Sequence, residues 1–263
     1  MGADIEEREK AAQRRVGSVK AAISILRHLE KTGSAMGVNA LARALDISPS
    51  SCFLLLKTLA DEQFLDFNPA TKHYSLGPGA IALGRSAIDP AGSFALARTK
   101  LEEVAAAHDV TVCLWRLRLS EQLIAVGVAE SVATTRIHIT TGHRLPIAAG
   151  AAGRCALAFS KSDAQSIVAR MASVRWANTP DLETYMHDLE KTRERGWAID
   201  EGDFLHGVTT VAAPVLNKQG LPELCLAATM FNGQHDSARQ QLIAKSLQEV
   251  GSWLSERMFL ASP

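Results

Sequence analysis

Apolar residues recur at helical spacing in two short runs of the chain, residues 38–45 and 49–59, which a tight turn at Asp46 and Ile47 separates. Ser48 is a favourable N-cap residue. Pro49 fits the first position of a helix, where a backbone N–H would have no intrahelical partner. The pattern therefore predicts two short helices joined by a turn, the second beginning at Pro49.

The second of these helices has two distinct faces. At about 100° per residue, one side is apolar and is expected to be core, while the other carries polar groups with Phe53 and Thr58 on its flanks. The pair is either a helix-turn-helix whose second helix enters the DNA major groove or an ordinary helical hairpin, and this stretch alone leaves both open. The apolar side holds Cys52, Leu55, Leu56 and Leu59, and the outer side holds Ser50, Leu54 and Lys57.

The neighbouring segments favour the DNA-binding interpretation. Residues 18–31 predict a further helix, with an apolar stripe of Val19, Ala22, Ile23, Leu26 and Leu29. After the second helix, extended segments at residues 64–67 and 72–77 flank a turn at residues 68–71, which predicts a β-hairpin. Two helices, a recognition helix and a hairpin are the order of a winged helix-turn-helix.

The rest of the chain interleaves strands and helices, which predicts an antiparallel-dominated α+β sheet flanked by helices. The Asp-Pro-Ala-Gly run at residues 89–92 breaks a helical stretch and is the expected linker. Predicted helices are residues 94–108, 149–159, 163–171, 181–195 and 237–260, and predicted strands are residues 110–119, 122–129, 136–140, 208–215 and 224–231.

Charge gives little support for any partner. The 263 residues contain 28 Lys and Arg against 28 Asp and Glu, and residues 1–85 contain 11 against 9. A weakly basic DNA-binding domain is expected to gain its affinity from dimerisation. The mixed-charge residues 1–15 read as a mobile arm, whose basic side chains either contact phosphates or are simply solvated; they are Arg8, Lys10, Arg14 and Arg15.

The sequence contains no recognisable signal for a membrane, a cofactor or catalysis. No apolar run approaches the ~18 residues of a membrane span, and the charged N-terminus lacks a secretory core, so a cytoplasmic location is expected. No metal signature or catalytic motif is found, so we expect no metal, no cofactor and no enzymatic activity. Cys52, Cys113, Cys155 and Cys225 are predicted to be small buried hydrophobic residues.

The ordered motifs resemble the IclR family of bacterial transcription regulators. In the N-terminal part they are SVKAAISILRHLEKTG, VNALARALDISPSSCFLLLKTLADEQFL and HYSLGPGAIALG, and further on GHRLPIAAGAAGRCALAF, RERGWAIDEGDFLHGVTTVAAPV and LCLAATM. The resemblance implies an N-terminal winged helix-turn-helix domain and a larger C-terminal GAF-like α/β domain with a mainly antiparallel sheet. The implied division is an arm at 1–15, a DNA-binding domain at 16–79, a linker at 80–92 and an effector-binding and oligomerisation domain at 93–260.

The resemblance also implies two sets of site residues. The small-residue run 148–153 at a helix start suits either an anion or close packing, and the family favours an effector there. The DNA-binding set is Ser50, Ser51, Phe53, Leu54, Lys57, Thr58 and Lys72. The effector-binding set is Ala151, Ala152, Asp200, Val208, Thr210, Ala227 and Thr229.

Several positions depart from the family pattern. Relatives often carry Cys at Thr210, Ser at Ala227 and Thr229, Arg at Leu54 and Gly at Gln63. The missing Ser hydroxyl at Ala227 predicts a less polar effector pocket, and the missing Arg at Leu54 removes a guanine contact. Asp200 would repel a carboxylate, so a neutral or amine-bearing effector stays open.

We therefore expect a ligand-responsive transcriptional regulator, a repressor or an activator, of a catabolic operon. A homodimer or homotetramer would bind a pseudo-palindromic double-stranded operator, and a small aromatic or organic-acid metabolite would change its affinity. The alternatives are a ligand-binding sensor or scaffold that does not bind DNA, and an enzyme whose N-terminal helices serve only for dimerisation.

Overall fold

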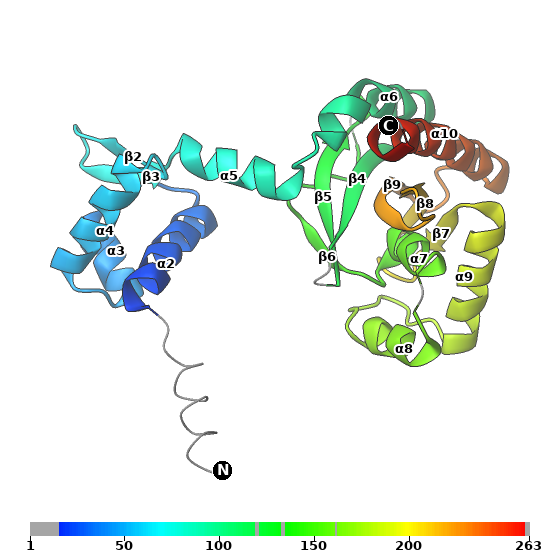
Figure 1. The fold of residues 1–263 in the computed structure, drawn as a ribbon, viewed down its shortest axis with the longest axis horizontal. Coiled ribbons are helices and arrows are strands. Elements are labelled where there is room, and N and C mark those ends of the chain that lie inside the picture. Colours follow the sequence, from blue (N-terminus) through cyan, green and yellow to red (C-terminus); the bar gives the residue numbers. More distant parts are fainter. Residues whose placement is uncertain (1–15, 119–120, 133–134, 161, 261–263) are drawn as a thin grey trace, which may run out of the picture. The chain divides into compact units, whose positions relative to one another are not determined.

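The computed structural model describes residues 16–118, 121–132, 135–160 and 162–260. Contacts between its elements divide the chain into two compact units, which meet in the sequence between Ala87 and Ile88. Figure 1 shows both units in the colours of the sequence. The predicted N-terminal arm, residues 1–15, lies outside the described residues.

The described part of the N-terminal unit packs three helices against a small antiparallel sheet, and a fourth helix follows at its end. The helices are α2 (Gly17–Thr32), α3 (Val38–Leu45) and α4 (Pro49–Asp61). The sheet has the order β1-β3-β2, with strands β1 (Met36–Gly37), β2 (Leu65–Asn68) and β3 (His73–Leu76). The β2–β3 hairpin is the predicted wing, and β1 is a short strand that the sequence pattern did not reveal. The winged helix-turn-helix prediction is confirmed.

The core of this unit explains why α4 lies where it does. Cys52 and Leu56 of α4 are buried against Ile25 and Leu29 of α2 and Leu41 of α3. Ser48 caps α4, because its side chain accepts a hydrogen bond from the N–H of Ser51.

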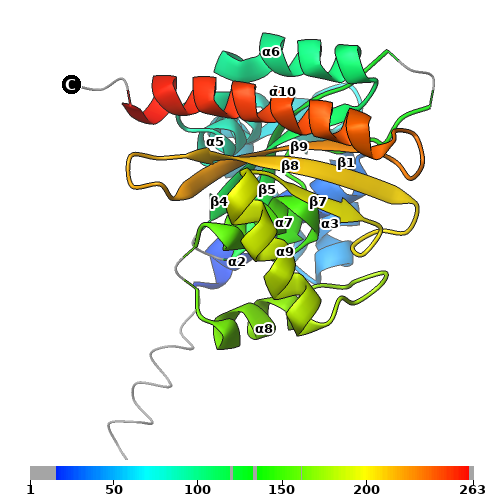
Figure 2. The same cartoon turned by 90° about the vertical axis from the view of Figure 1, so that its right-hand side faces the viewer.

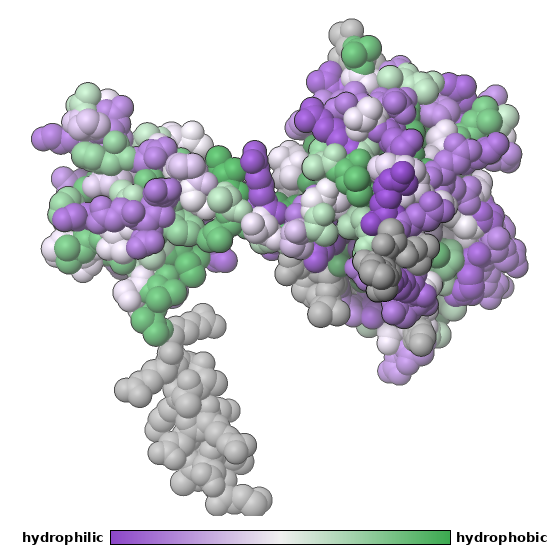
Figure 3. Space-filling model, turned by 45° about the horizontal axis from the view of Figure 1, so that its top comes forward, coloured by the Kyte–Doolittle hydropathy of each residue, from purple (hydrophilic) through white to green (hydrophobic). Residues whose placement is uncertain are grey.

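The apolar stripe predicted for α2 is only partly right. Val19 and Ile23 are exposed, whereas Ile25 and Leu29 are buried. Figure 3 shows hydrophobic colour on the surface of the N-terminal unit, whereas the visible face of the C-terminal unit is mostly hydrophilic. The next helix, α5 (Pro78–Ile88), has no buried residue.

The C-terminal unit is built on a six-stranded antiparallel sheet with the order β6-β5-β4-β9-β8-β7. Long strands occupy its centre, and short strands form its edges. The strands are β4 (Thr111–Arg118), β5 (Gln122–Ala129), β6 (Arg144–Pro146), β7 (Ala198–Glu201), β8 (Val208–Leu216) and β9 (Pro222–Phe231).

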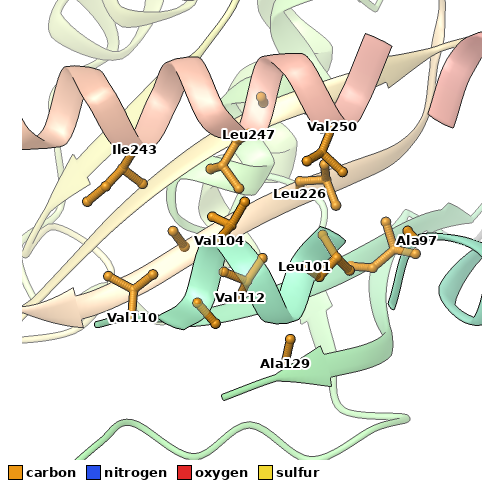
Figure 4. Close-up of a cluster of buried hydrophobic side chains, with 14 of the residues drawn as sticks. Ala97, Leu101, Val104, Val110, Val112, Ala129, Leu226, Ile243, Leu247 and Val250 are labelled. Carbon is orange, nitrogen blue, oxygen red and sulfur yellow. The ribbon is translucent and has the colours of Figure 1, made fainter. Parts of the chain in front are cut away.

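Helices cover both faces of this sheet (Figure 2). On one face, α6 (Ser93–His108) and α10 (Ser237–Ser255) enclose the largest apolar cluster together with the central strands, as Figure 4 shows. The π-helical segment Glu256–Leu260 follows α10. On the other face lie α7 (Gly150–Ala158) and α9 (Leu182–Arg195), with α8 (Ala164–Ala172) beyond them. The predicted α+β class with a mainly antiparallel sheet is confirmed.

Residues 136–140 do not form the strand that their alternating pattern predicted. They have no regular secondary structure, and the edge strand is instead β6. Alternation shows only that every second side chain is directed toward an apolar region. Ile137 and Ile139 are half-buried at a cavity, and Ile139 also packs on the apolar cluster of the sheet, without any backbone pairing to a described strand. None of the helices in the described part of the chain is long and apolar enough to cross a membrane.

Candidate functional site

A cavity of about 290 Å³ lies between α7 and the β8–β9 part of the sheet, and we call it the α7 cavity. Six of the seven residues in the predicted effector-binding set line it, although they come from three separate segments of the sequence. The six are Ala151, Ala152, Val208, Thr210, Ala227 and Thr229.

The floor of the α7 cavity follows from strand register. Thr210 of β8 is paired with Thr229 of β9, so that their side chains lie next to each other on one face of the sheet. Thr229 is nine-tenths buried, and neither hydroxyl makes a hydrogen bond to another described residue. Ala227, two residues before Thr229, adds an apolar patch to the same face. The floor therefore offers two free hydroxyl groups in apolar surroundings.

The start of α7 forms one wall of the cavity. Its N-cap residue is Ala149, and in the described structure no side chain caps the helix. Gly150, Ala151 and Ala152 line the cavity, so the unpaired N–H groups of the first turn lie at its edge. An uncapped helix N-terminus favours a negatively charged group.

A strap of residues 137–143 covers another side of the cavity. The Thr111 hydroxyl donates a hydrogen bond to the Ile137 carbonyl at 2.6 Å, and Ala125 exchanges backbone hydrogen bonds with Gly142 and His143 at 2.8 and 2.9 Å. The His143 ring meets the Trp115 ring edge-on, with centroids 6.4 Å apart. These contacts hold the strap over the cavity without forming a strand.

Sequence reasoning missed most of the bulky lining residues. In the sequence, the alternation of Ile137 and Ile139 is the one signal that these residues face an apolar region, and it predicts a strand that does not form. The missed residues are Trp115, Ile137, His138, Ile139, Thr140, His143, Leu145, Phe204 and Leu205.

Asp200 is the one residue of the predicted effector-binding set that does not line the α7 cavity. It is buried beside this cavity. Its Oδ2 accepts a hydrogen bond from Nη1 of Arg154 at 2.6 Å, and Arg154 is itself only 1% exposed. Because the carboxylate is paired, it gives no reason to exclude an acidic effector.

Arg154 joins three elements around the cavity. Besides Asp200 of β7, its guanidinium contacts Asp188 of α9 at 3.0 Å and Asp203 at 2.5 Å. Burial lowers the pKa of Arg154, but the negative charges of Asp200 and the other carboxylates more than offset this and raise it. Asp203 precedes Phe204, so the ion pair fixes the loop that supplies Phe204 and Leu205 to the cavity wall.

The predicted DNA-binding residues all lie on the surface of the N-terminal unit. Phe53 and Leu54 are 48% and 63% exposed. Ser50, Ser51, Lys57 and Thr58 are exposed on the same helix, and Lys72 is exposed in the turn of the wing. The structure thus brings six of them together on α4 and places the seventh on the hairpin.

The entry to the wing is formed without the glycine that relatives often have. Gln63 adopts a left-handed conformation with φ of 61°, and the neighbouring chain approaches it through Gly77 and Gly79. A Cβ at either glycine would lie 2.6 or 2.8 Å from the Gln63 carbonyl oxygen. Gln63 thus makes the turn itself, and the two later glycines leave room for its carbonyl group.

The four cysteines are buried free thiols. Cys113, Cys155 and Cys225 belong to one apolar cluster beneath the α7 cavity, and burial raises the pKa of the Cys113 and Cys225 thiols well above the usual value. Among the described residues, no group of three or more His, Cys, Asp or Glu side chains is arranged to hold a metal ion.

Comparison with known proteins identifies both units. Residues 86–256 match the family model "Bacterial transcriptional regulator IclR C-terminal", and residues 18–69 match the "IclR helix-turn-helix domain". The chain is 25% identical over 215 residues to the HTH-type transcriptional repressor AllR of Escherichia coli K12, a match that covers 81% of this chain and 79% of AllR.

Solved structures agree with this result. The IclR transcriptional regulator of Alicyclobacillus acidocaldarius is 29% identical, with a TM-score of 0.72 over 92% of this chain and 98% of that one. The Thermotoga maritima IclR shares the fold at 19% identity, with a TM-score of 0.81 over 93% and 99% of the two chains. The family and these relatives are transcriptional regulators rather than enzymes. The chain therefore belongs to the IclR family of bacterial transcriptional regulators, and it is a DNA-binding regulator that responds to a ligand.

Proposed function

We propose that this regulator is a repressor that binds its operator as a homodimer or homotetramer, with α4 of each DNA-binding unit in a major groove. The exposed set on α4, Lys72 on the wing and the buried opposite face of α4 support this orientation. The repressor role follows the name of AllR. Two such units would read a pseudo-palindrome whose half-sites lie about 10 bp, or a multiple of this, apart.

The finer division of the chain is part of the same proposal. An arm at residues 1–15 precedes a DNA-binding domain at 16–79, a linker at 80–92 and an effector-binding and oligomerisation domain at 93–260. The division between Ala87 and Ile88 falls within this linker, which supports the assignment.

The effector is a small organic acid with a largely apolar body, and it binds in the α7 cavity. The observation that carries this proposal is that six residues of the predicted effector-binding set line one cavity: Ala151, Ala152, Val208, Thr210, Ala227 and Thr229. The uncapped start of α7 would hold the carboxylate, and Thr210 and Thr229 would donate hydrogen bonds to it. Trp115 and Phe204 suit an aromatic or aliphatic body.

A ligand of this kind is typical of regulation by a catabolite. It would change operator affinity only as far as it binds the DNA-competent and DNA-incompetent states with different affinity.

The test is a fluorescence anisotropy titration of the full-length protein against its own upstream DNA at several salt concentrations. Saturable binding that weakens steeply with salt is expected, and small carboxylic acids added one at a time should shift it. Lys57→Ala should weaken binding and reduce the salt slope by about one, because one phosphate contact is lost. Unchanged affinity and slope in this variant would contradict the proposed DNA-facing side of α4.

A further inference from the structure

Two large apolar side chains stand next to each other on the solvent side of α4. Phe53 and Leu54 are 48% and 63% exposed, whereas Cys52 and Leu56 of the same helix are buried. Leu54 lies four residues after Ser50 and three before Lys57, so it occupies the centre of the exposed face. Most of its apolar surface stays in water when this unit folds and therefore gains no hydrophobic stabilisation.

The polar groups around Leu54 have limited capacity to read bases. The Ser48 hydroxyl caps the helix and hydrogen-bonds both Ser51 and Ser50, at 2.8 and 3.3 Å. The Thr58 hydroxyl donates to the Leu54 carbonyl at 3.0 Å. The side chains that bind guanine or adenine in a bidentate manner are Arg, Lys, Asn and Gln, and of these the sequence of α4 contains only Lys57.

The charge of this face favours DNA over a protein partner as its occupant. Lys57 is the one cation in the sequence of α4, and the one acid, Asp61, stands at the end of the helix. Lys72 adds a second exposed cation on the wing. From Ser50 to Thr58 this face holds hydroxyls and a cation and no acid, since Asp61 lies one turn beyond Lys57. This part of α4 is complementary to phosphates on either side of a groove.

The major groove presents one apolar feature, the C5 methyl group of thymine. We infer that α4 recognises thymine in each half-site by packing Leu54, flanked by Phe53, against C5 methyl groups, while Lys57 supplies a phosphate or guanine contact. This inference rests on the proposed function, because it requires α4 to enter the major groove. Specificity then comes from methyl contacts rather than from an arginine fork.

The experiment begins with selection of binding sites from a random duplex library by the full-length protein. Each thymine of the selected half-site is then replaced by uracil, which pairs identically and lacks only the methyl group, and affinity is measured by anisotropy at fixed salt. At one or two positions, uracil should weaken binding by the wild type about fourfold per methyl, the transfer value of one buried methylene group.

Two variants make the test specific. Leu54→Ala should bind more weakly and lose the response to uracil at the same position, because the partner of the methyl group is gone. Leu83→Ala is the control, because Leu83 is a leucine of α5 with a similar exposure of 59%, and it should keep the full response. Both side chains are on the surface, so both variants should fold, which circular dichroism verifies.

The possible failures are distinguishable. Enriched sites that bind equally well with uracil, or a Leu54→Ala protein that keeps the wild-type response, would overturn the methyl-reading inference and leave DNA binding intact. A protein that enriches no sequence from the library would overturn the proposed function of α4, and the inference with it.

Discussion

Within α7, Gly153 lies against the backbone of the segment that leads into the helix, and there is no room for a side chain at this position. A Cβ on Gly153 would lie 2.3 Å from the carbonyl carbon of Ala148 and 2.8 Å from the carbonyl oxygen of Ile147. Both are main-chain atoms, which cannot rotate away as a flexible side chain would. Gly153 is thus the residue that lets α7 pack against the chain that leads into it.

Gly153→Ala should therefore destabilise the C-terminal unit by about 2 kcal/mol, in the range of an overpacked core. Urea unfolding followed by tryptophan fluorescence measures this, because all four Trp residues lie in that unit. Gly84→Ala is the control: Gly84 has open space around its Cβ position in α5, and this change should leave the tryptophan transition unmoved. Equal midpoints for the wild type and Gly153→Ala would contradict the packing argument.

A second residue-scale feature links α6 to α10. His108 is buried, its Nε2 lies 3.0 Å from the Ser246 hydroxyl, and its fully buried Nδ1 has no hydrogen-bond partner among the described residues. Burial lowers the pKa of His108, and the nearby Arg239 and His235 lower it further.

The stability of the C-terminal unit should consequently fall in acid. The unfolded chain takes up a proton on His108 near pH 6.5, whereas the folded chain takes it up only at lower pH, so the free energy of unfolding decreases as pH drops below about 6.5. His108→Gln, which keeps an amide nitrogen near Ser246, should show a shallower decrease in tryptophan-monitored urea unfolding between pH 5 and 8. An identical pH profile would exclude His108 as the cause.

Contacts between side chains that are far apart in the sequence could not be predicted from residue patterns. Asp200 was placed in the effector pocket, and nothing in its neighbourhood revealed that Arg154, 46 residues earlier, neutralises it. The family resemblance implied Ala151, Ala152, Ala227 and Thr229, and these four residues do line the α7 cavity, because a shared fold preserves backbone position.

At the scale of elements, the ion pair between Arg154 and Asp203 helps to hold the loop from Gly202 to Gly207 in place. Arg154 on α7 holds Asp203 at 2.5 Å, and the backbone carbonyl of Asp203 accepts hydrogen bonds from the N–H groups of Ala177 and Asn178, both at 2.9 Å. Gly202 and Gly207 both have positive φ, of 106° and 74°. Contacts from two sides thus fix a loop whose ends are intrinsically flexible.

Loss of the Asp203 contact should loosen this loop selectively. In Asp203→Asn, amide hydrogen exchange of residues 204–207 should be about fivefold faster, since a charge-assisted hydrogen bond screened by solvent contributes about 1 kcal/mol. Asp188→Asn removes another carboxylate of similar exposure from the same guanidinium, but on α9, and should leave the loop unchanged. Equal acceleration in both variants would refute a specific role of Asp203.

Elements with strong periodicity were predictable, and short edge elements were not. The helices α6 and α10 and the central strands β8 and β9 followed from their patterns, because one whole face of each is buried. The edge strands β6 and β7 have only three and four residues, too few to show a period.

At the scale of the whole molecule, the proposed homodimer or homotetramer would supply most of the strength of DNA binding. The chain carries no net charge, so electrostatic attraction to DNA is weak for a single unit. Two linked recognition helices gain affinity because the second binds at high effective concentration.

The spacing of half-sites should accordingly control binding. Inserting 5 bp between the half-sites of the selected operator turns them to opposite faces of the duplex and should weaken binding at least tenfold. Inserting 10 bp restores the alignment and should recover part of the affinity. Anisotropy titrations of the three duplexes measure this, and equal affinity for all of them would mean that each half-site is bound independently.

The helix α5 has 11 residues and buries none of them. Isolated helices shorter than about 12–15 residues are marginally stable in water, so the helical state of α5 has little free energy of its own. A free energy of only about 1.4 kcal/mol then changes its ratio of helix to coil tenfold. Because α5 ends where the two units meet in the sequence, a small change in free energy at either end of this helix should be enough to lengthen or shorten it.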